Sequence, residues 1–248
     1  MAPGGDVDAE IVLAPGGQAA NVAAWASELG ARSRFLGKRG DDDAARLARE
    51  GLSARGVEVL GPAAGRSAVV CSLVAADGER SLISDRGAAA ELEESEVDAR
   101  WLEGCDHLFV SGYALRSEPS RTAALRAVEL ARSESASVSV DLSSWIAIRD
   151  AGPGRFRDAV ETLAPDAVFA NEDEEGALGG PLPGTAWILK LGARGCSFAG
   201  DERPAVPVER IVDTTGAGDA LAAGWIVGGP DLALEAAARC VARLGSMP

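Results

Sequence analysis

The residues with the clearest chemical potential lie in the stretch Ile-Val-Asp-Thr-Thr-Gly-Ala-Gly-Asp-Ala at positions 211–220. An apolar run stops there at a Thr/Gly turn, and a long apolar helical pattern begins directly after it. The start of a helix offers backbone N–H groups and a positive dipole end, which together attract phosphate. A carboxylate at such a spot, Asp219, suits a base that takes a proton from a hydroxyl attacking phosphorus. Asp219 could equally be a helix cap, because the dipole favours a negative charge there.

A second candidate site joins the first apolar run to the first helical pattern, at Gly16, Gly17 and Asn21. Paired glycines let a ligand approach the backbone closely. Asn21 lies about one helical turn further on, and its amide both donates and accepts hydrogen bonds, as a polyhydroxylated ligand requires. A plain glycine turn followed by a surface asparagine would have the same sequence.

Two further candidates follow expected strands, Asn171 with Glu174, and the segment 190–195. Carboxylates and an amide at a strand end can hold a hydrated Mg²⁺ and orient phosphates, although acidic residues also favour any helix start. The segment 190–195 is either the floor of a nucleotide site or an ordinary β-turn. The sequence has no GxxxxGK[ST] loop and no GxGxxG that opens a helix after the first strand, so P-loop NTPases and Rossmann dehydrogenases are disfavoured.

Alternating strand-like and helical patterns must position these residues. Helical patterns cover 18–29, 42–54, 119–133, 154–163, 217–227 and 231–244. Strand-like runs cover 33–36, 57–60, 107–111, 137–141, 167–170 and 186–191. This alternation predicts a mostly parallel sheet flanked by helices, in which ligands bind outside the carboxyl ends of the strands. Polar residues fall at four of those ends, namely Ser111, Asp141, Asn171 and Lys190.

One segment breaks the alternation. The runs 67–76 and 79–85 are joined by Asp77-Gly78, which is a strong hairpin signal, and no helix intervenes. The apolar run 10–14 is also followed by a glycine turn. We interpret these runs as a small antiparallel sheet outside the main one, either a mobile flap over the site or an ordinary edge hairpin.

The bulk composition excludes several classes of protein. The chain has 24 basic and 38 acidic residues, a net charge of −14, and no basic patch, so a nucleic-acid or anionic-membrane partner is not expected. No apolar stretch reaches the length of a membrane span, and the first residues do not form a signal peptide. The four cysteines form no CxxC pair, so we expect core thiols in a reducing cytoplasm. The single histidine, His107, borders an apolar run and is expected to be structural rather than part of a zinc site or a triad.

In their order and approximate spacing, these motifs resemble those of the ribokinase-like carbohydrate kinases of the phosphofructokinase-B type. The resemblance runs from about residue 10 to the C-terminus. The most specific match is the Asp-Thr-Thr-Gly-Ala-Gly-Asp motif at 213–219. The other matches are Gly16-Gly17 with Asn21, Asn171 with Glu174, the segment 190–195, and the weaker Gly40-Asp41-Asp42-Asp43, Asp85-Arg86-Gly87-Ala88 and Arg243-Leu244-Gly245.

The resemblance implies a three-layer α/β/α fold with a mostly parallel central sheet and a small antiparallel β lid. The main kinase domain would comprise residues 16–66 and 88–248, and the lid segments would be 5–15 and 67–87. It also implies ATP-dependent phosphorylation of a sugar hydroxyl, with Asp219 as the general base. The amides of Gly216, Ala217 and Gly218 would form the anion hole.

Further roles are implied by the same resemblance. Gly16, Gly17 and Asn21, together with Asp219, would contact the sugar. Nucleotide contacts would come from Asn171, Lys190, Gly192, Gly195 and Gly218. Glu174 would act on Mg²⁺, through water. Asp213 and Thr215 correspond to positions that help to bind a monovalent cation in some members, which makes K⁺ a further candidate.

The chain departs from the family at its start. The family usually opens with a buried strand that ends in a Gly-Asp pair, followed by an Asp that binds substrate hydroxyls. Here Gly5-Asp6-Val7-Asp8 lacks the preceding apolar strand, so we expect one core strand and one substrate ligand to be absent.

Three hypotheses follow from the sequence. The first is a cytoplasmic sugar kinase that acts on a small molecule, without nucleic-acid or membrane partners, and that forms a homodimer through the open edge of the lid. The second is a nucleoside kinase on the same scaffold, ranked lower because few aromatic residues lie near the expected site. The third is a family member that binds its ligand without turnover.

Overall fold

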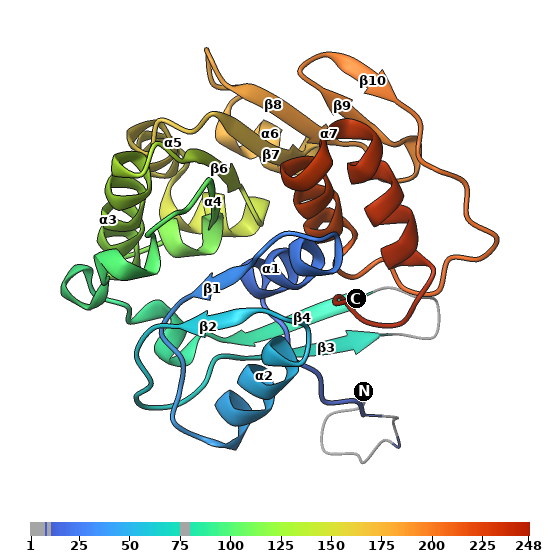
Figure 1. The fold of residues 1–248 in the computed structure, drawn as a ribbon. Coiled ribbons are helices and arrows are strands. Elements are labelled where there is room, and N and C mark those ends of the chain that lie inside the picture. Colours follow the sequence, from blue (N-terminus) through green and yellow to red (C-terminus); the bar gives the residue numbers. More distant parts are fainter. Residues whose placement is uncertain (1–7, 9–10, 75–79) are drawn as a thin grey trace.

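The computed structural model describes residue 8 and residues 11–74 and 80–248, and its centre is a six-stranded sheet (Figure 1). The strand order is β10-β9-β8-β7-β6-β5, in which β5 to β8 are parallel and β9 and β10 are antiparallel additions at one edge. The strands are β5 (His107–Ser111), β6 (Ser137–Asp141), β7 (Ala167–Asn171), β8 (Ala186–Lys190), β9 (Cys196–Phe198) and β10 (Asp201–Arg203). The expected mostly parallel sheet is therefore confirmed.

Helices cover both faces of this sheet, so its inner strands are apolar on both sides. In β7, Phe169 packs into a core shared with α1 and α7, whereas Val168 and Ala170 pack into a core shared with the other helices. The first face carries α1 (Gln18–Glu28) and α7 (Ala217–Val241). The second face carries α3 (Ser120–Ser133), α4 (Trp145–Ala151), α5 (Pro153–Thr162) and α6 (Glu172–Leu178).

Helix α7 is interrupted where two separate helices were expected. Gly228 and Gly229 have non-helical dihedrals, and Pro230 follows them, so the backbone breaks at this point and then resumes. Trp225, just before the break, meets the ring of Phe169 edge-on at 5.6 Å between ring centroids. The two halves of α7 therefore keep independent directions against the sheet (Figure 1).

Two small sheets lie apart from the main one. β1 (Arg34–Leu36) and β2 (Glu58–Leu60) pair in parallel around α2 (Asp43–Ser53). β3 (Val69–Val74) and β4 (Arg80–Asp85) pair antiparallel, which confirms the expected pairing of the two runs. The expected turn Asp77-Gly78 lies outside the described residues.

Several expectations need correction. No strand forms at residues 11–14, because the side chains of Ile11 and Leu13 are 84% and 81% exposed and no neighbouring strand pairs with them. Residues 5–7 and 9–10 lie outside the described part, so the division into main and lid segments stays a prediction. Cys71 is exposed on β3 and is not a core thiol, whereas Cys196 and Cys240 are buried.

Short elements were also missing from the sequence analysis. They include α4, α6, β9, β10 and the 3₁₀ turns Gly87–Ala90, Glu94–Glu96, Ala99–Trp101, Gly112–Leu115 and Gly192–Arg194. Among the helices that the structure describes, none is long and apolar enough to cross a bilayer.

Candidate active site

The carboxyl ends of the four parallel strands bring the predicted polar residues together. Ser111 of β5 is in register with Asp141 of β6, and Asn171 of β7 is in register with Lys190 of β8. Parallel strands end on the same side of a sheet, so these side chains share one edge. The start of α7 reaches the same edge, because Gly218 lies against Lys190.

Asp219 is held from the side by Asn21 at the start of α1. The Asn21 Nδ2 donates to Asp219 Oδ2 at 2.6 Å, and the Ser246 Oγ donates to Asn21 Oδ1 at 3.1 Å. Asn21 is 6% exposed, so both ends of its amide are used inside the protein. Asn21 and Asp219, which were both expected to contact the sugar, therefore lie together, and the amide orients the carboxylate.

The electrostatic environment of Asp219 favours its protonated form more than water does. Burial raises the pKa of Asp219 to about 7, while the hydrogen bond from Asn21 lowers it. The charge of Asp141 also contributes to this rise, and the charge of Lys190 opposes it. A carboxyl group with a pKa near neutrality is suited to accept a proton during a reaction.

The turn before α7 depends on Gly216. Its φ is +82°, in the left-handed region, and a Cβ at this position would lie 2.6 Å from the Cα of Ser246. A side chain would therefore be strained and would collide with the C-terminal segment. The N–H of Ala217 donates to the Thr214 carbonyl at 3.3 Å, a long bond that a phosphoryl oxygen could replace.

A buried ion pair lies beside this turn. The Lys190 Nζ donates to Asp141 Oδ2 at 2.7 Å and lies 3.7 Å from Glu174 Oε2. Burial opposes the positive charge, but the charges of Asp141 and Glu174 outweigh burial and raise the pKa of Lys190. Burial also raises the pKa of Glu174, with Lys190 acting in the opposite direction. The lysine therefore carries a fixed positive charge in an otherwise acidic site.

Asn171 and Glu174 form a reciprocal cap at the start of α6. The Glu174 N–H donates to Asn171 Oδ1 at 2.8 Å, and the Asn171 N–H donates to Glu174 Oε2 at 2.8 Å. This capping box is the local reason for the Asn-x-x-Glu spacing. Glu174 is also 3% exposed and adjacent to Lys190, so its carboxylate belongs to both the cap and the charged cluster.

The predicted glycines occupy their positions for different structural reasons. Gly17 caps α1 with φ +103°, and its carbonyl accepts the N–H of Asn21 at 2.8 Å. Gly16 and Gly192 have open space where a Cβ would stand. At Gly195 a Cβ would lie 2.0 Å from the carbonyl oxygen of Arg203, so this glycine is required by packing alone. The structure thus leaves the nucleotide roles of Gly192 and Gly195 as predictions.

Asp213 organises the loop that leads to Gly216. Its Oδ1 accepts from the N–H and Oγ1 of Thr215 at 2.8 and 2.6 Å, and its Oδ2 accepts from the Gly245 N–H at 3.1 Å. These bonds tie the loop to the segment after α7. The monovalent-cation role of Asp213 and Thr215 stays a prediction.

Sequence reasoning did not assign roles to Gln18 and Ser143. The Gln18 Oε1 accepts from the hydroxyls of Ser111 and Ser143, the latter at 2.6 Å, and the Ser143 N–H donates to Asp141 Oδ1 at 2.9 Å. Gln18 therefore joins α1 to the ends of β5 and β6. Its position directly after Gly17 was the available signal.

The β3–β4 sheet reaches the site through Arg86. The Arg86 Nη2 donates to the Tyr113 carbonyl at 2.7 Å, and the guanidinium lies 5.9 Å from the centre of the Tyr113 ring. Tyr113 belongs to the turn after β5 and is within electrostatic reach of Glu174, Asp141 and Asp219. This contact places the end of β4 near the carboxyl edge of the main sheet.

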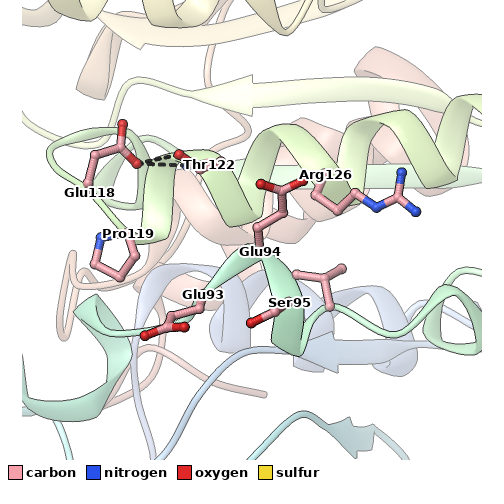
Figure 2. Close-up of a pocket in the computed structure, with 8 residues that line it drawn as sticks. Glu93, Glu94, Ser95, Glu118, Pro119, Thr122 and Arg126 are labelled. Carbon is pink, nitrogen blue, oxygen red and sulfur yellow. Dashed lines mark hydrogen bonds between the residues drawn. The ribbon is translucent and has the colours of Figure 1, made fainter.

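Two other features lie away from this edge. His107 of β5 is hydrogen-bonded through both ring nitrogens to Ser137 and Ser139 at 2.7 Å, and burial lowers its pKa to about 4. It is therefore a structural histidine. A cavity of about 750 Å³ contains none of the predicted site residues (Figure 2), and it is lined by Glu93, Glu94, Ser95, Val97, Glu118, Pro119, Thr122 and Arg126.

Comparison with known proteins is consistent with this geometry. The family model described as "pfkB family carbohydrate kinase" matches residues 5–247. A relative named Fructokinase-1, from Oryza sativa subsp. japonica, is 33% identical over 235 residues, which covers 84% of this chain and 72% of the relative. A relative named ATP-dependent ribose-1-phosphate kinase, from Halopiger xanaduensis, is 32% identical over 245 residues, which covers 91% of this chain and 78% of the relative.

The fold has a solved counterpart. The crystal structure of a putative Ribokinase II from E. coli, in complex with ATP and Mg²⁺, superimposes with a TM-score of 0.83 at 24% identity. The match covers 98% of this chain and 89% of that chain. The ribokinase-like three-layer architecture is therefore shown.

Proposed function

Since the chain belongs to the pfkB family of carbohydrate kinases, we propose that it transfers the γ-phosphoryl group of ATP to a hydroxyl group of a sugar. The observation that carries this proposal is the half-buried Asp219, held by Asn21 at the first turn of α7. A base and a helix N-terminus at one point provide what a hydroxyl attacking a phosphoryl group needs.

In the proposed reaction, Asp219 takes the proton of the sugar hydroxyl as the oxygen attacks the γ-phosphorus in line. The first-turn amides of α7, from Gly216 to Gly218, meet the charge on the transferring group. Asn21 keeps the carboxylate pointed at the hydroxyl. The glycine turn at Gly16 and Gly17 leaves the backbone near Asn21 open to the sugar.

The nucleotide is proposed to lie along the ends of β7 and β8, at Asn171, Lys190, Gly192 and Gly195. When bound, Mg²⁺ would neutralise negative charge on the phosphates. The buried carboxylate of Glu174 fits such an ion, because Mg²⁺ needs only one or two carboxylates beside water and phosphate oxygens. Glu174 would hold it through water.

The proposal is tested by Asp219→Asn. This variant should fold and bind ATP, but its kcat should fall by ~10²-fold or more, because a general base is lost. The matched control is Asp231→Asn on the same helix, whose side chain is 86% exposed and pairs with Arg203. Release of ADP from a sugar reaction is the measurement, and near-normal turnover of Asp219→Asn would contradict the assignment.

Substrate range separates the remaining hypotheses. A coupled ADP assay over sugars, including fructose and ribose 1-phosphate, and over nucleosides would distinguish a sugar kinase from a nucleoside kinase. Ligand binding without ADP release across the whole panel would support a non-catalytic member instead.

Assembly, location and ion requirement are further parts of the proposal. Four large apolar side chains are exposed on the β3–β4 sheet, and they support a homodimer through this surface, namely Val69, Val70, Leu82 and Ile83. Small-angle scattering at several concentrations would test it. A cytoplasmic location and a K⁺ requirement at Asp213 and Thr215 are proposed on the family resemblance, and the latter is tested by exchanging K⁺ for tetramethylammonium.

A further inference from the structure

Lys190 is an unusual residue for this chain to place in its site. The sequence holds two lysines among its 24 basic residues, and all the others are arginines. The second lysine, Lys38, pairs with Glu96 at 2.9 Å and lies outside the site. The ammonium group of a lysine is a compact charge with three rotatable donors, whereas an arginine presents a rigid planar fork. The choice of lysine at 190 is therefore consistent with a narrow, specific position.

The position of Lys190 faces the turn where the phosphoryl group is expected. A Cβ placed on Gly218 would lie 3.4 Å from the Lys190 Cδ and 3.6 Å from its Nζ. Glycine at 218 thus leaves the ammonium group in direct reach of the first turn of α7. Asp141, at 1% side-chain exposure, accepts a hydrogen bond from the Nζ at 2.7 Å.

The charge of the site also requires a cation here. The carboxylates of Asp141, Glu174 and Asp219 all act on Lys190 electrostatically. A phosphoryl group that approaches three carboxylates is repelled less when a positive charge lies among them. Lys190 is the cationic side chain that the described part of the chain places within this group.

We propose that Lys190 is a catalytic residue whose ammonium group binds the transferring phosphoryl group, and that Asp141 is the positioning residue that holds it. The proposal rests on the proposed kinase function. The bond from the acceptor oxygen to the γ-phosphorus forms while the bond to the bridging oxygen breaks. The leaving ADP keeps the electron pair, and the hydroxyl proton passes to Asp219. Lys190 exchanges no proton. Its positive charge stabilises the negative charge on the equatorial oxygens of the transferring phosphoryl group.

A purely structural role makes a different prediction. If Lys190 only neutralises Asp141, then removing both charges together should restore activity as well as the stability that is lost when Asp141 is left without its cation. If Lys190 acts on the phosphoryl group, the double variant should regain stability and remain slow. The pair of variants Lys190→Met and Lys190→Met with Asp141→Asn therefore separates the two roles.

The expected results are as follows. Lys190→Met should lower kcat by ~10²-fold or more and lower the Tm, because Asp141 loses its partner. The double variant should recover the Tm and keep the low kcat, while Asp141→Asn alone stays within about tenfold of the unmodified enzyme. Recovery of kcat in the double variant, or a loss in Asp141→Asn as large as in Lys190→Met, would overturn the proposal.

Binding provides a second readout that does not depend on turnover. ADP with aluminium fluoride and a sugar acceptor mimics the transferring group, so the double variant should bind ADP normally but lose the fluoride-dependent gain in affinity. Retention of that gain would also overturn the proposal. The control is Lys38→Met, which breaks the ion pair with Glu96 and should leave both readouts unchanged.

These outcomes are separable from failure of the proposed function. If the unmodified protein phosphorylates no acceptor, the kinase proposal itself fails. If it does so, and Asp219→Asn is slow while the double variant is fast, only the role of Lys190 is wrong.

Discussion

At the carboxyl ends of β6 and β8, charged side chains are buried and paired, whereas along β3 and β4 large apolar side chains face solvent. Asp141 is 1% exposed and bonded to Lys190, while Leu82 and Ile83 are 61% and 62% exposed. In the first region, burial of the charged side chains costs free energy, and hydrogen-bonded partners of opposite charge offset this cost. The second leaves apolar surface open, as expected where something else is to cover it or be covered. The charged groups of the candidate site are thus fixed by the core, whereas the β3–β4 sheet, the proposed lid, exposes apolar side chains.

The largest expected difference between the regions is in their contribution to stability. An isoleucine-to-alanine substitution in each region measures this difference. Ile188→Ala in β8 should reduce the free energy of unfolding by about 2–5 kcal/mol, because the side chain is 1% exposed. Ile83→Ala in β4 should change it by about 0.5 kcal/mol or less. Urea unfolding of both variants is the measurement, and equal losses would show that the β3–β4 sheet is part of the core.

Glycine substitutions examine the reactive region more closely. Gly216 and Gly192 both have positive φ, +82° and +60°, but only Gly216 also faces a close neighbour, Ser246. Gly192→Ala should therefore lose about 1 kcal/mol from backbone strain alone, and Gly216→Ala about 1–3 kcal/mol more from overlap. Thermal unfolding at one pH compares the two variants. Equal losses of stability would contradict a tightly packed turn at Gly216.

The pH profile of the reaction tests how Asn21 tunes the base. Asp219 must be ionised to accept a proton, so kcat/KM should fall below a midpoint near pH 7. The hydrogen bond from Asn21 stabilises the ionised form, so Asn21→Ala should move the midpoint upward by about one pH unit, or ~1.4 kcal/mol. A midpoint that stays in place or moves to lower pH would show that Asn21 does not hold the carboxylate.

Replacing Asp219, the proposed base, should also increase stability. The pKa of Asp219 is raised in the fold from 3.8 to about 7, so its ionisation disfavours the folded state. This group is most compatible with the fold below pH 4, and stability is lost as the pH rises toward 7. Asp219→Asn should therefore raise the Tm at pH 8 by ~2 °C or more and have little effect at low pH. A lower Tm at pH 8 would contradict the assigned burial.

Much of the site was predictable because its residues follow strong local patterns. The parallel strands appear in the sequence as short apolar runs. The polar residues predicted at their ends are Ser111, Asp141, Asn171 and Lys190. The place of Asp219 in the first turn of α7 was predictable because a glycine turn precedes an apolar helical pattern.

Other parts depend on contacts that a local pattern does not contain. The bond from Ser246 to Asn21 joins residues 225 positions apart, and the partner of Lys190 lies on a strand two places away in the sheet. The run at 10–14 was expected to be a strand because it is apolar, but apolar sequence forms a strand only when a partner edge is available. Short elements such as β9 and β10 carry too few residues to show a period.

The bond between Asn21 and Asp219 has a consequence for the order in which the molecule becomes active. It joins residues 198 positions apart, and the turn at Gly216 is completed by Ser246. During synthesis, all six strands of the main sheet leave the ribosome before α7 does. A nascent chain can therefore form much of its core before α7 has folded and positioned Asp219, the proposed base. We expect phosphoryl transfer to begin only when the segment around Ser246 has emerged, so that unfinished chains do not consume ATP.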